Sequence, residues 1–125
     1  MENTNRKVAV IGAGPSGITA LKNLLDKGIK AVAFDRNQEI GGNWIYSEEE
    51  SHSSVFETTH IISSKTLSQY EDFTFDEFDT TVADYPSHDE LRRYFQAYGK
   101  KFDLYPHIRF GTRVKQVQWI DQDNW

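Results

Sequence analysis

Three closely spaced glycines near the N-terminus set the strongest constraint on how this chain folds. They lie in the segment "VIGAGPSG", residues 10–17. The preceding run "KVAVI", residues 7–11, is short, apolar and rich in β-branched side chains, which is typical of a buried parallel strand. From residue 16 to residue 27 the apolar side chains recur at helical spacing. A glycine-rich turn between a strand and a helix is the setting in which this pattern indicates dinucleotide binding.

A second apolar run completes the unit. Gly28 stands where a helix commonly ends, and "AVAFD", residues 31–35, follows it as a second strand. Strand, helix and strand within about thirty residues form a βαβ unit. The sequence therefore predicts an α/β fold of the Rossmann-like class, with a parallel sheet.

The glycines and the acid that ends the second strand have expected tasks. Gly12 permits the turn out of the first strand, Gly14 lets the backbone approach a diphosphate, and Gly17 lets the helix pack close to the strand. The start of the helix offers unpaired N–H groups to phosphate oxygens. Asp35 is placed to accept hydrogen bonds from ribose hydroxyls and to repel a 2′-phosphate, which favours FAD or NAD over NADP. Arg36 argues the other way, because an arginine there can hold a 2′-phosphate.

Composition excludes several other classes. The 125 residues fit one domain, and the net charge of -5 disfavours nucleic acid and anionic membranes as partners. No apolar run is long enough to span a bilayer and no secretory segment opens the chain, so we expect a cytoplasmic protein. The chain has no cysteine, and its histidines lack zinc-site spacing, so we expect no metal centre. These histidines are His52, His60, His88 and His107.

The second half of the chain contains a clear helix. Ser87 and Glu90 form a capping box, and apolar residues recur from there to about Phe102. The stretch from residue 55 to residue 86 is irregular, apart from a possible short strand near residues 60–62.

The last residues indicate strands and a turn. Residues 107–120 predict two short strands around Gly111, and "DQDN", residues 121–124, predicts the turn of a β-hairpin. Trp125 would then begin the returning strand. We therefore expect an incomplete fold that ends at the start of a hairpin.

A glycine doublet favours FAD over NAD. A typical NAD dehydrogenase passes from the second strand into another helix, whereas this chain continues as "DRNQEIGGNW" with Gly41 and Gly42. Glycines let a backbone pass close to a ligand. The alternative interpretation of the doublet is an ordinary turn. The alternative interpretation of the first glycine motif is a βαβ unit that binds no nucleotide.

Four segments together resemble the N-terminal part of flavin-containing monooxygenases. They are "VIGAGPSG", "FDRNQEIGGNW", "YEDFTF" and "YPSHDELRRYFQAYGKKFDL", and the resemblance runs from Val8 to about Trp119. The resemblance implies that FAD binds in this first nucleotide fold and that NADPH, bound in a second one, reduces it. Reduced flavin then reacts with O2 to a C4a-hydroperoxide that oxygenates a soft nitrogen or sulfur atom of a small-molecule substrate, or in some relatives a carbonyl. The NADPH motif would fall beyond Trp125, so the chain by itself should not turn over.

The resemblance also implies a set of FAD contacts. Residues 12–16 would line the diphosphate, Asp35 the adenosine ribose, and Asn43 and Trp44 the rest of the cofactor, with the segment up to Lys65 near the isoalloxazine. The expected cofactor-binding residues are Gly12, Ala13, Gly14, Pro15, Ser16, Gly17, Asp35, Arg36, Gly42, Asn43, Trp44, Ile62 and Ser63. No catalytic residue is assigned.

One position departs from the family pattern. Many members carry an asparagine beside the flavin where this chain has Ile62, which can neither donate nor accept a hydrogen bond. The hydroxyls of Ser63 and Ser64 are candidates to replace it. Among other flavoproteins, disulfide reductases need a redox cysteine pair that is absent here. An amine-oxidase-like flavoprotein and an inactive truncated FAD module are the alternatives.

Overall fold

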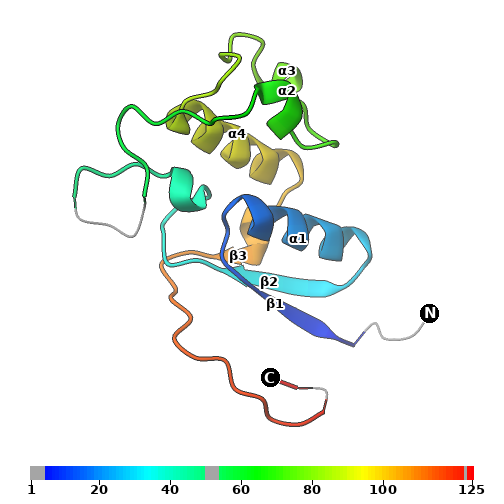
Figure 1. Cartoon of the computed structure of the whole chain (residues 1–125). Helices are drawn as coiled ribbons and strands as arrows, with labels where there is room; N and C mark the ends of the chain where they lie inside the picture. The colour runs from blue at the N-terminus through cyan, green and yellow to red at the C-terminus, as the bar shows by residue number, and fades with distance from the viewer. Residues whose placement is uncertain (1–4, 50–53, 123) are drawn as a thin grey trace.

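A parallel sheet of order β1-β2-β3 underlies the part of the chain that the computed structural model describes, residues 5–49, 54–122 and 124–125 (Figure 1). β1 (Lys7–Ile11) leads through α1 (Pro15–Asp26) to β2 (Lys30–Phe34), which pairs in parallel with β1 from Lys7↔Lys30 to Ile11↔Phe34. The predicted βαβ unit is confirmed.

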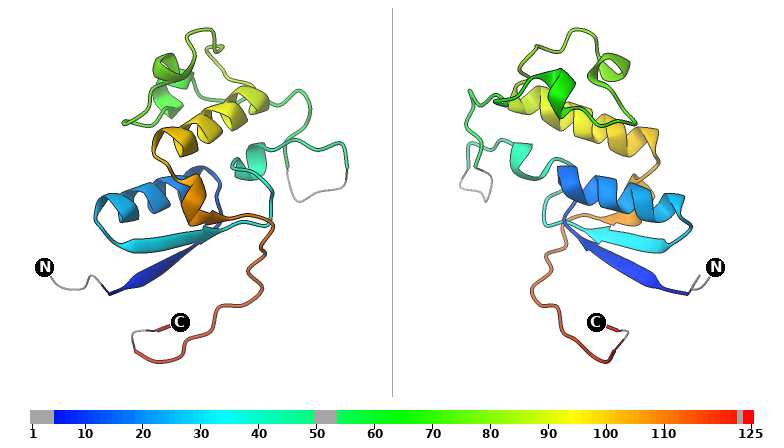
Figure 2. Two further views of the ribbon diagram at one scale, coloured as in Figure 1. Left: turned by 180° about the vertical axis from the view of Figure 1, so that it is seen from behind. Right: turned by 45° about the vertical axis from the view of Figure 1, so that its right-hand side comes forward.

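The third strand comes from far along the chain. β3 (Ile108–Arg109) pairs in parallel with the end of β2, through Ala33↔Ile108 and Phe34↔Arg109. Between them the chain forms further helical segments, which lie with α1 on one side of the sheet (Figures 1 and 2). These segments are η1 (Gly42–Trp44), α2 (Lys65–Ser68), α3 (Phe75–Phe78), α4 (His88–Lys101) and η2 (Tyr105–His107).

The core lies between the sheet, α1 and α4. α4 starts with the predicted capping box, in which Ser87 Oγ accepts from the Glu90 amide and the Glu90 carboxylate accepts from the Ser87 amide. Leu91, Tyr94, Phe95 and Tyr98 are buried at helical spacing along α4, as their sequence pattern indicates. A second capping box, Thr74 with Glu77, starts the short α3 and was not predicted.

Gly17 sets the distance between α1 and β1. A Cβ atom at this position would lie 1.9 Å from the carbonyl oxygen of Gly12, far inside any contact distance. The first turn of α1 therefore packs directly on the backbone that leaves β1, as predicted for the third glycine of the motif.

The prediction of a buried first strand is wrong in part. Lys7, Ala9 and Ile11 of β1 are exposed, Ile11 at 61%, while Val8 and Val10 face the core. The reason is that the described helices cover only one face of the sheet, so strand residues alternate between the two environments.

Two further strand predictions are also wrong. No strand forms at residues 60–62; instead His60 makes an isolated bridge with Ser87, and the Ile61 amide donates to the Pro86 carbonyl. This segment therefore lies along the start of α4 rather than in a sheet.

The segment after β3 departs from the prediction too. Beyond Gly111, where a second strand was expected, the described residues form no ladder. After Thr112, whose amide donates to the Asp35 carbonyl, the chain leaves the body of the molecule as an extended tail (Figure 1). The predicted turn is present, as an Asp121↔Asn124 bridge, but Trp125 begins no strand. Local propensity for a strand has no effect here because no described strand lies beside the tail to pair with it.

The helices of the described chain are too short or too polar to cross a lipid bilayer.

The contact at Gly17 gives a stability prediction. We expect Gly17→Ala to lower the free energy of unfolding by about 2 kcal/mol or more, because the new methyl group forces α1 away from the Gly12 carbonyl. Helix propensity alone would give the opposite result, a gain of about 1 kcal/mol. Urea denaturation measures the difference, with Asn23→Ala at an exposed position of α1 as the control. A Gly17→Ala protein as stable as the wild type would contradict the packing described.

Candidate dinucleotide-binding site

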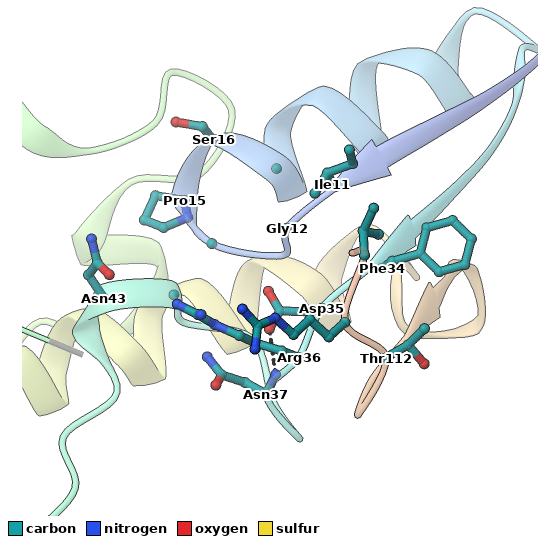
Figure 3. Close-up of a pocket in the computed structure, with 15 residues that line it drawn as sticks. Ile11, Gly12, Pro15, Ser16, Phe34, Asp35, Arg36, Asn37, Asn43 and Thr112 are labelled. Carbon is teal, nitrogen blue, oxygen red and sulfur yellow. Dashed lines mark hydrogen bonds between the residues drawn. The ribbon is translucent and has the colours of Figure 1, made fainter. Parts of the chain in front are cut away.

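A cavity of about 540 Å³ opens where β1 and β2 end and α1 begins (Figure 3). This is the edge at which parallel α/β sheets bind ligands, and the volume is in the range of small-molecule sites. Nine of the predicted cofactor-binding residues line the cavity. They are Gly12, Gly14, Pro15, Ser16, Gly17, Asp35, Arg36, Gly42 and Asn43.

The start of α1 presents free N–H donors to this cavity. Within the described residues, the amides of Ser16 and Gly17 donate to no protein acceptor, whereas the next amide, that of Ile18, already bonds to the Gly14 carbonyl at 3.1 Å. Pro15, which has no N–H, occupies the first helical position, and no acidic side chain lies in the first turn. Free amides together with the positive end of the helix dipole make a site for an anion.

The two glycine segments touch each other beside these donors. A Cβ on Gly42 would lie 3.0 Å from the Cα of Gly14, and Gly42 has φ +56°, a conformation that favours glycine. The doublet is thus more than an ordinary surface turn, because it packs its backbone against the first glycine motif. Gly14 therefore has two reasons to lack a side chain. It is expected to lie close to a ligand, and its backbone is in contact with Gly42.

Asp35 is buried beneath the turn and is 7% exposed. Its Oδ2 accepts from the Ala13 amide at 2.6 Å, and its Oδ1 accepts from the Asn37 amide at 2.7 Å (Figure 3). Each carboxylate oxygen has a further acceptor site, so the group can hold the turn and still accept from a ribose hydroxyl. Ala13 itself is fully buried, and its N–H points to Asp35 rather than into the cavity.

Two cationic side chains and the segment after β3 also line the cavity. Arg36, one of the expected cofactor-binding residues, lines the cavity, and Thr112, Arg113 and Val114, which were not predicted, line it too. The Thr112 amide donates to the Asp35 carbonyl at 2.8 Å, which fixes this segment beside the end of β2. The sequence carried a signal for it, because a third parallel strand ending at the same edge would place the residues after it there.

Other predicted contacts lie outside the cavity. Trp44 is half-buried against the apolar core, Ile62 is 98% exposed, and Ser63 Oγ bonds to Ser68 Oγ at 2.5 Å. Lys65 Nζ donates to the Val82 carbonyl at 3.0 Å. The bridge between His60 and Ser87 ties this stretch to the start of α4, so the cavity brings together the predicted diphosphate and ribose contacts but not Trp44, Ile62 or Ser63.

The described residues contain no cluster of side chains able to hold a metal ion. His60 Nδ1 bonds with the Tyr85 carbonyl and His88 Nε2 with the Glu57 carbonyl, so each ring has a backbone partner from a distant part of the sequence. His52 lies outside the described residues. The cavity lining offers anion donors, a carboxylate acceptor and two guanidinium groups, a set suited to binding an anionic ligand.

Comparison with known proteins identifies the family. The sequence profile of the flavin-binding monooxygenase-like family matches residues 5–123. Flavin-containing monooxygenase 2 of Homo sapiens is 37% identical over 118 residues, which cover 90% of this chain and 21% of the human protein. This chain therefore spans about a fifth of that relative's length.

Solved structures agree with the sequence match. S-allyl-L-cysteine S-oxygenase from Allium sativum superposes with a TM-score of 0.83 at 26% identity, covering 90% of this chain and 29% of that one. An oxidized steroid monooxygenase bound to NADP gives a TM-score of 0.72 at 25% identity, over 86% of this chain and 20% of that one. The chain belongs to the flavin-binding monooxygenase-like family.

Proposed function

We propose that residues 1–125 form the N-terminal part of the FAD-binding domain of an NADPH-dependent flavin monooxygenase. The observation that carries the proposal is the pair of unpartnered amides at Ser16 and Gly17, set at the start of a helix beside the buried Asp35 carboxylate. A dinucleotide has the matching chemistry, since it joins an anionic diphosphate to a ribose with hydroxyl donors.

The residues present fit FAD. The amides of Ser16 and Gly17 would bind the diphosphate, and Asp35 would accept from the adenosine ribose. Gly42 and Asn43 both line the cavity, and Asn43 lies on the side opposite to Thr112 (Figure 3), so the flavin end of the cofactor would leave past Asn43. When bound, FAD would supply the redox chemistry, and the protein around it would supply binding and orientation.

Arg36 and Arg113 decide less about the cofactor than Asp35 does. Both arginine side chains line the cavity and are exposed, so each can reorient toward a phosphate group of either cofactor. The Asp35 carboxylate is fixed by two N–H donors and cannot turn away from a 2′-phosphate. This asymmetry supports FAD here, with NADPH bound elsewhere in the longer protein.

For the whole protein we propose oxygenation of soft nitrogen or sulfur centres in small molecules, using O2 and NADPH. The name of the S-oxygenase from Allium sativum supports oxygenation at sulfur, and the name of the human relative supports flavin-dependent monooxygenation. In the longer protein, O2-dependent NADPH oxidation that yields an oxygenated amine or sulfide tests the reaction. NADPH oxidation without an oxygenated product would count against it.

FAD binding can be measured directly. We expect the purified protein to retain visible flavin absorption after gel filtration with FAD, and its melting temperature to rise with FAD concentration. Binding at 100 times Kd stabilises the folded state by about 2.7 kcal/mol. Riboflavin, which lacks the phosphates, and NADP, which carries a 2′-phosphate, serve as controls and should give a much smaller rise. A protein that stays colourless and melts at the same temperature with FAD would refute the proposal.

The diphosphate position can be tested at Ser16. We expect Ser16→Asp to weaken FAD binding about 10-fold or more, because a carboxylate at the start of α1 repels the phosphates by about 1–4 kcal/mol at 4 Å separation. The same charge is favourable at a helix N-terminus, so stability should not fall. Ser16→Asn is the matched neutral control. Equal FAD affinities for the Asp and Asn variants in low salt would place the diphosphate elsewhere.

A further inference from the structure

Tyr70 reaches the dinucleotide site from outside the cavity. Its hydroxyl donates to the carbonyl oxygen of Pro15 at 2.6 Å, across 55 positions of sequence. Pro15 is the first residue of α1, immediately before the two free amides at Ser16 and Gly17. The hydrogen bond therefore acts on the turn that carries the anion donors, although Tyr70 itself does not line the cavity.

The position of Tyr70 is fixed by α4. Its amide donates to Tyr94 Oη at 2.8 Å, and Tyr94 Oη in turn donates to the Phe73 carbonyl. Its ring lies against the rings of Tyr98, with centroids 4.7 Å apart, and Tyr94, with centroids 5.7 Å apart. Contacts with α4 thus hold both the backbone and the ring of Tyr70 independently of the hydrogen bond to Pro15.

The hydroxyl of Tyr70 remains a donor over the whole physiological pH range. Burial raises the pKa of Tyr70 above its ordinary value, and the neighbouring Tyr94, Tyr98 and Asp72 raise it further. A carbonyl oxygen can only accept, so a protonated hydroxyl is the state that this contact requires.

We propose that Tyr70 is a positioning residue for the diphosphate end of the site, linking α4 to the first turn of α1. This inference rests on the proposed function. With the hydroxyl in place, the Pro15 carbonyl is held and the amides of the next two residues keep a fixed direction. Without it the first turn of α1 gains freedom that a bound diphosphate must remove, and preorganisation of this kind contributes directly to affinity.

The test compares two tyrosines that contact each other. In Tyr70→Phe the ring stays and the bond to Pro15 is lost. In the control, Tyr98→Phe, the ring stays and the lost bond is one to Asp72 Oδ2 at 3.2 Å. Both hydroxyls belong to one aromatic cluster, so the pair separates loss of the Pro15 contact from loss of a tyrosine hydroxyl in general.

We expect Tyr70→Phe to weaken FAD binding about 3- to 10-fold, the effect of one hydrogen bond, and Tyr98→Phe to change it less than 2-fold. Competition of ADP and of adenosine with FAD shows whether affinity is lost at the diphosphate or at the adenosine end of the cofactor. ADP affinity should fall with that of FAD in Tyr70→Phe, while adenosine affinity stays unchanged because adenosine carries no phosphate. Urea denaturation of both variants shows whether each is folded.

Three outcomes would overturn the proposal. The first is an unchanged FAD affinity in Tyr70→Phe while the wild type binds FAD, which leaves the proposed function standing. The second is an equal loss for FAD, ADP and adenosine in both variants, which indicates general loosening of the cluster. The third is absence of FAD binding by the wild type, which removes the proposed function together with this inference.

Discussion

The buried carboxylate of Asp35 is the interaction on which the site depends. Its side chain accepts from the Ala13 amide in the turn after β1 and from the Asn37 amide after β2. Its own amide donates to the Arg109 carbonyl of β3, and its carbonyl accepts from Thr112. One residue therefore joins the ends of all the described strands at the edge where the cavity opens. Hydrogen bonds from several N–H groups are what make a buried carboxylate tolerable.

This arrangement gives Asp35 a structural task as well as the expected ligand contact. A substitution at Asp35 would disturb the glycine turn and the Thr112 segment as well as any contact with a ribose, because the Asp35 carboxylate holds the turn through its hydrogen bond from the Ala13 amide. Its effect on ribose binding could therefore not be measured separately. Ser16 is a cleaner probe, since its side chain is exposed and only its amide is part of the anion site. The same reasoning favours Tyr70→Phe, which removes one oxygen atom and keeps the packed ring.

The sequence correctly predicted those features of the fold that depend on neighbouring residues or on a known motif. The strand–turn–helix unit, the close packing at Gly17 and the Ser87 capping box follow from residues a few positions apart. The predictions at 60–62 and after Gly111 were wrong because strands need partner strands: His60 makes only an isolated bridge with Ser87, and no described strand lies beside the tail. The lining of the cavity by Arg113 could have been found from the parallel strand that precedes it, whereas the contact between Tyr70 and Pro15 depends on tertiary placement that spacing along the chain does not encode. The contacts expected at Trp44, Ile62 and Ser63 stay predictions.

α4 supports the site although none of its residues lines the cavity. Gln96 Nε2 donates to the Ile40 carbonyl at 3.1 Å and to Glu39 Oε2 at 2.9 Å, which holds the segment that leads into the glycine doublet. Through Tyr70 the same helix holds the first turn of α1. Contacts from one helix, α4, thus stabilise both of the glycine segments that touch at Gly14 and Gly42. The placement of these two segments therefore rests on contacts from α4 and Tyr70 as well as on their direct contact with each other.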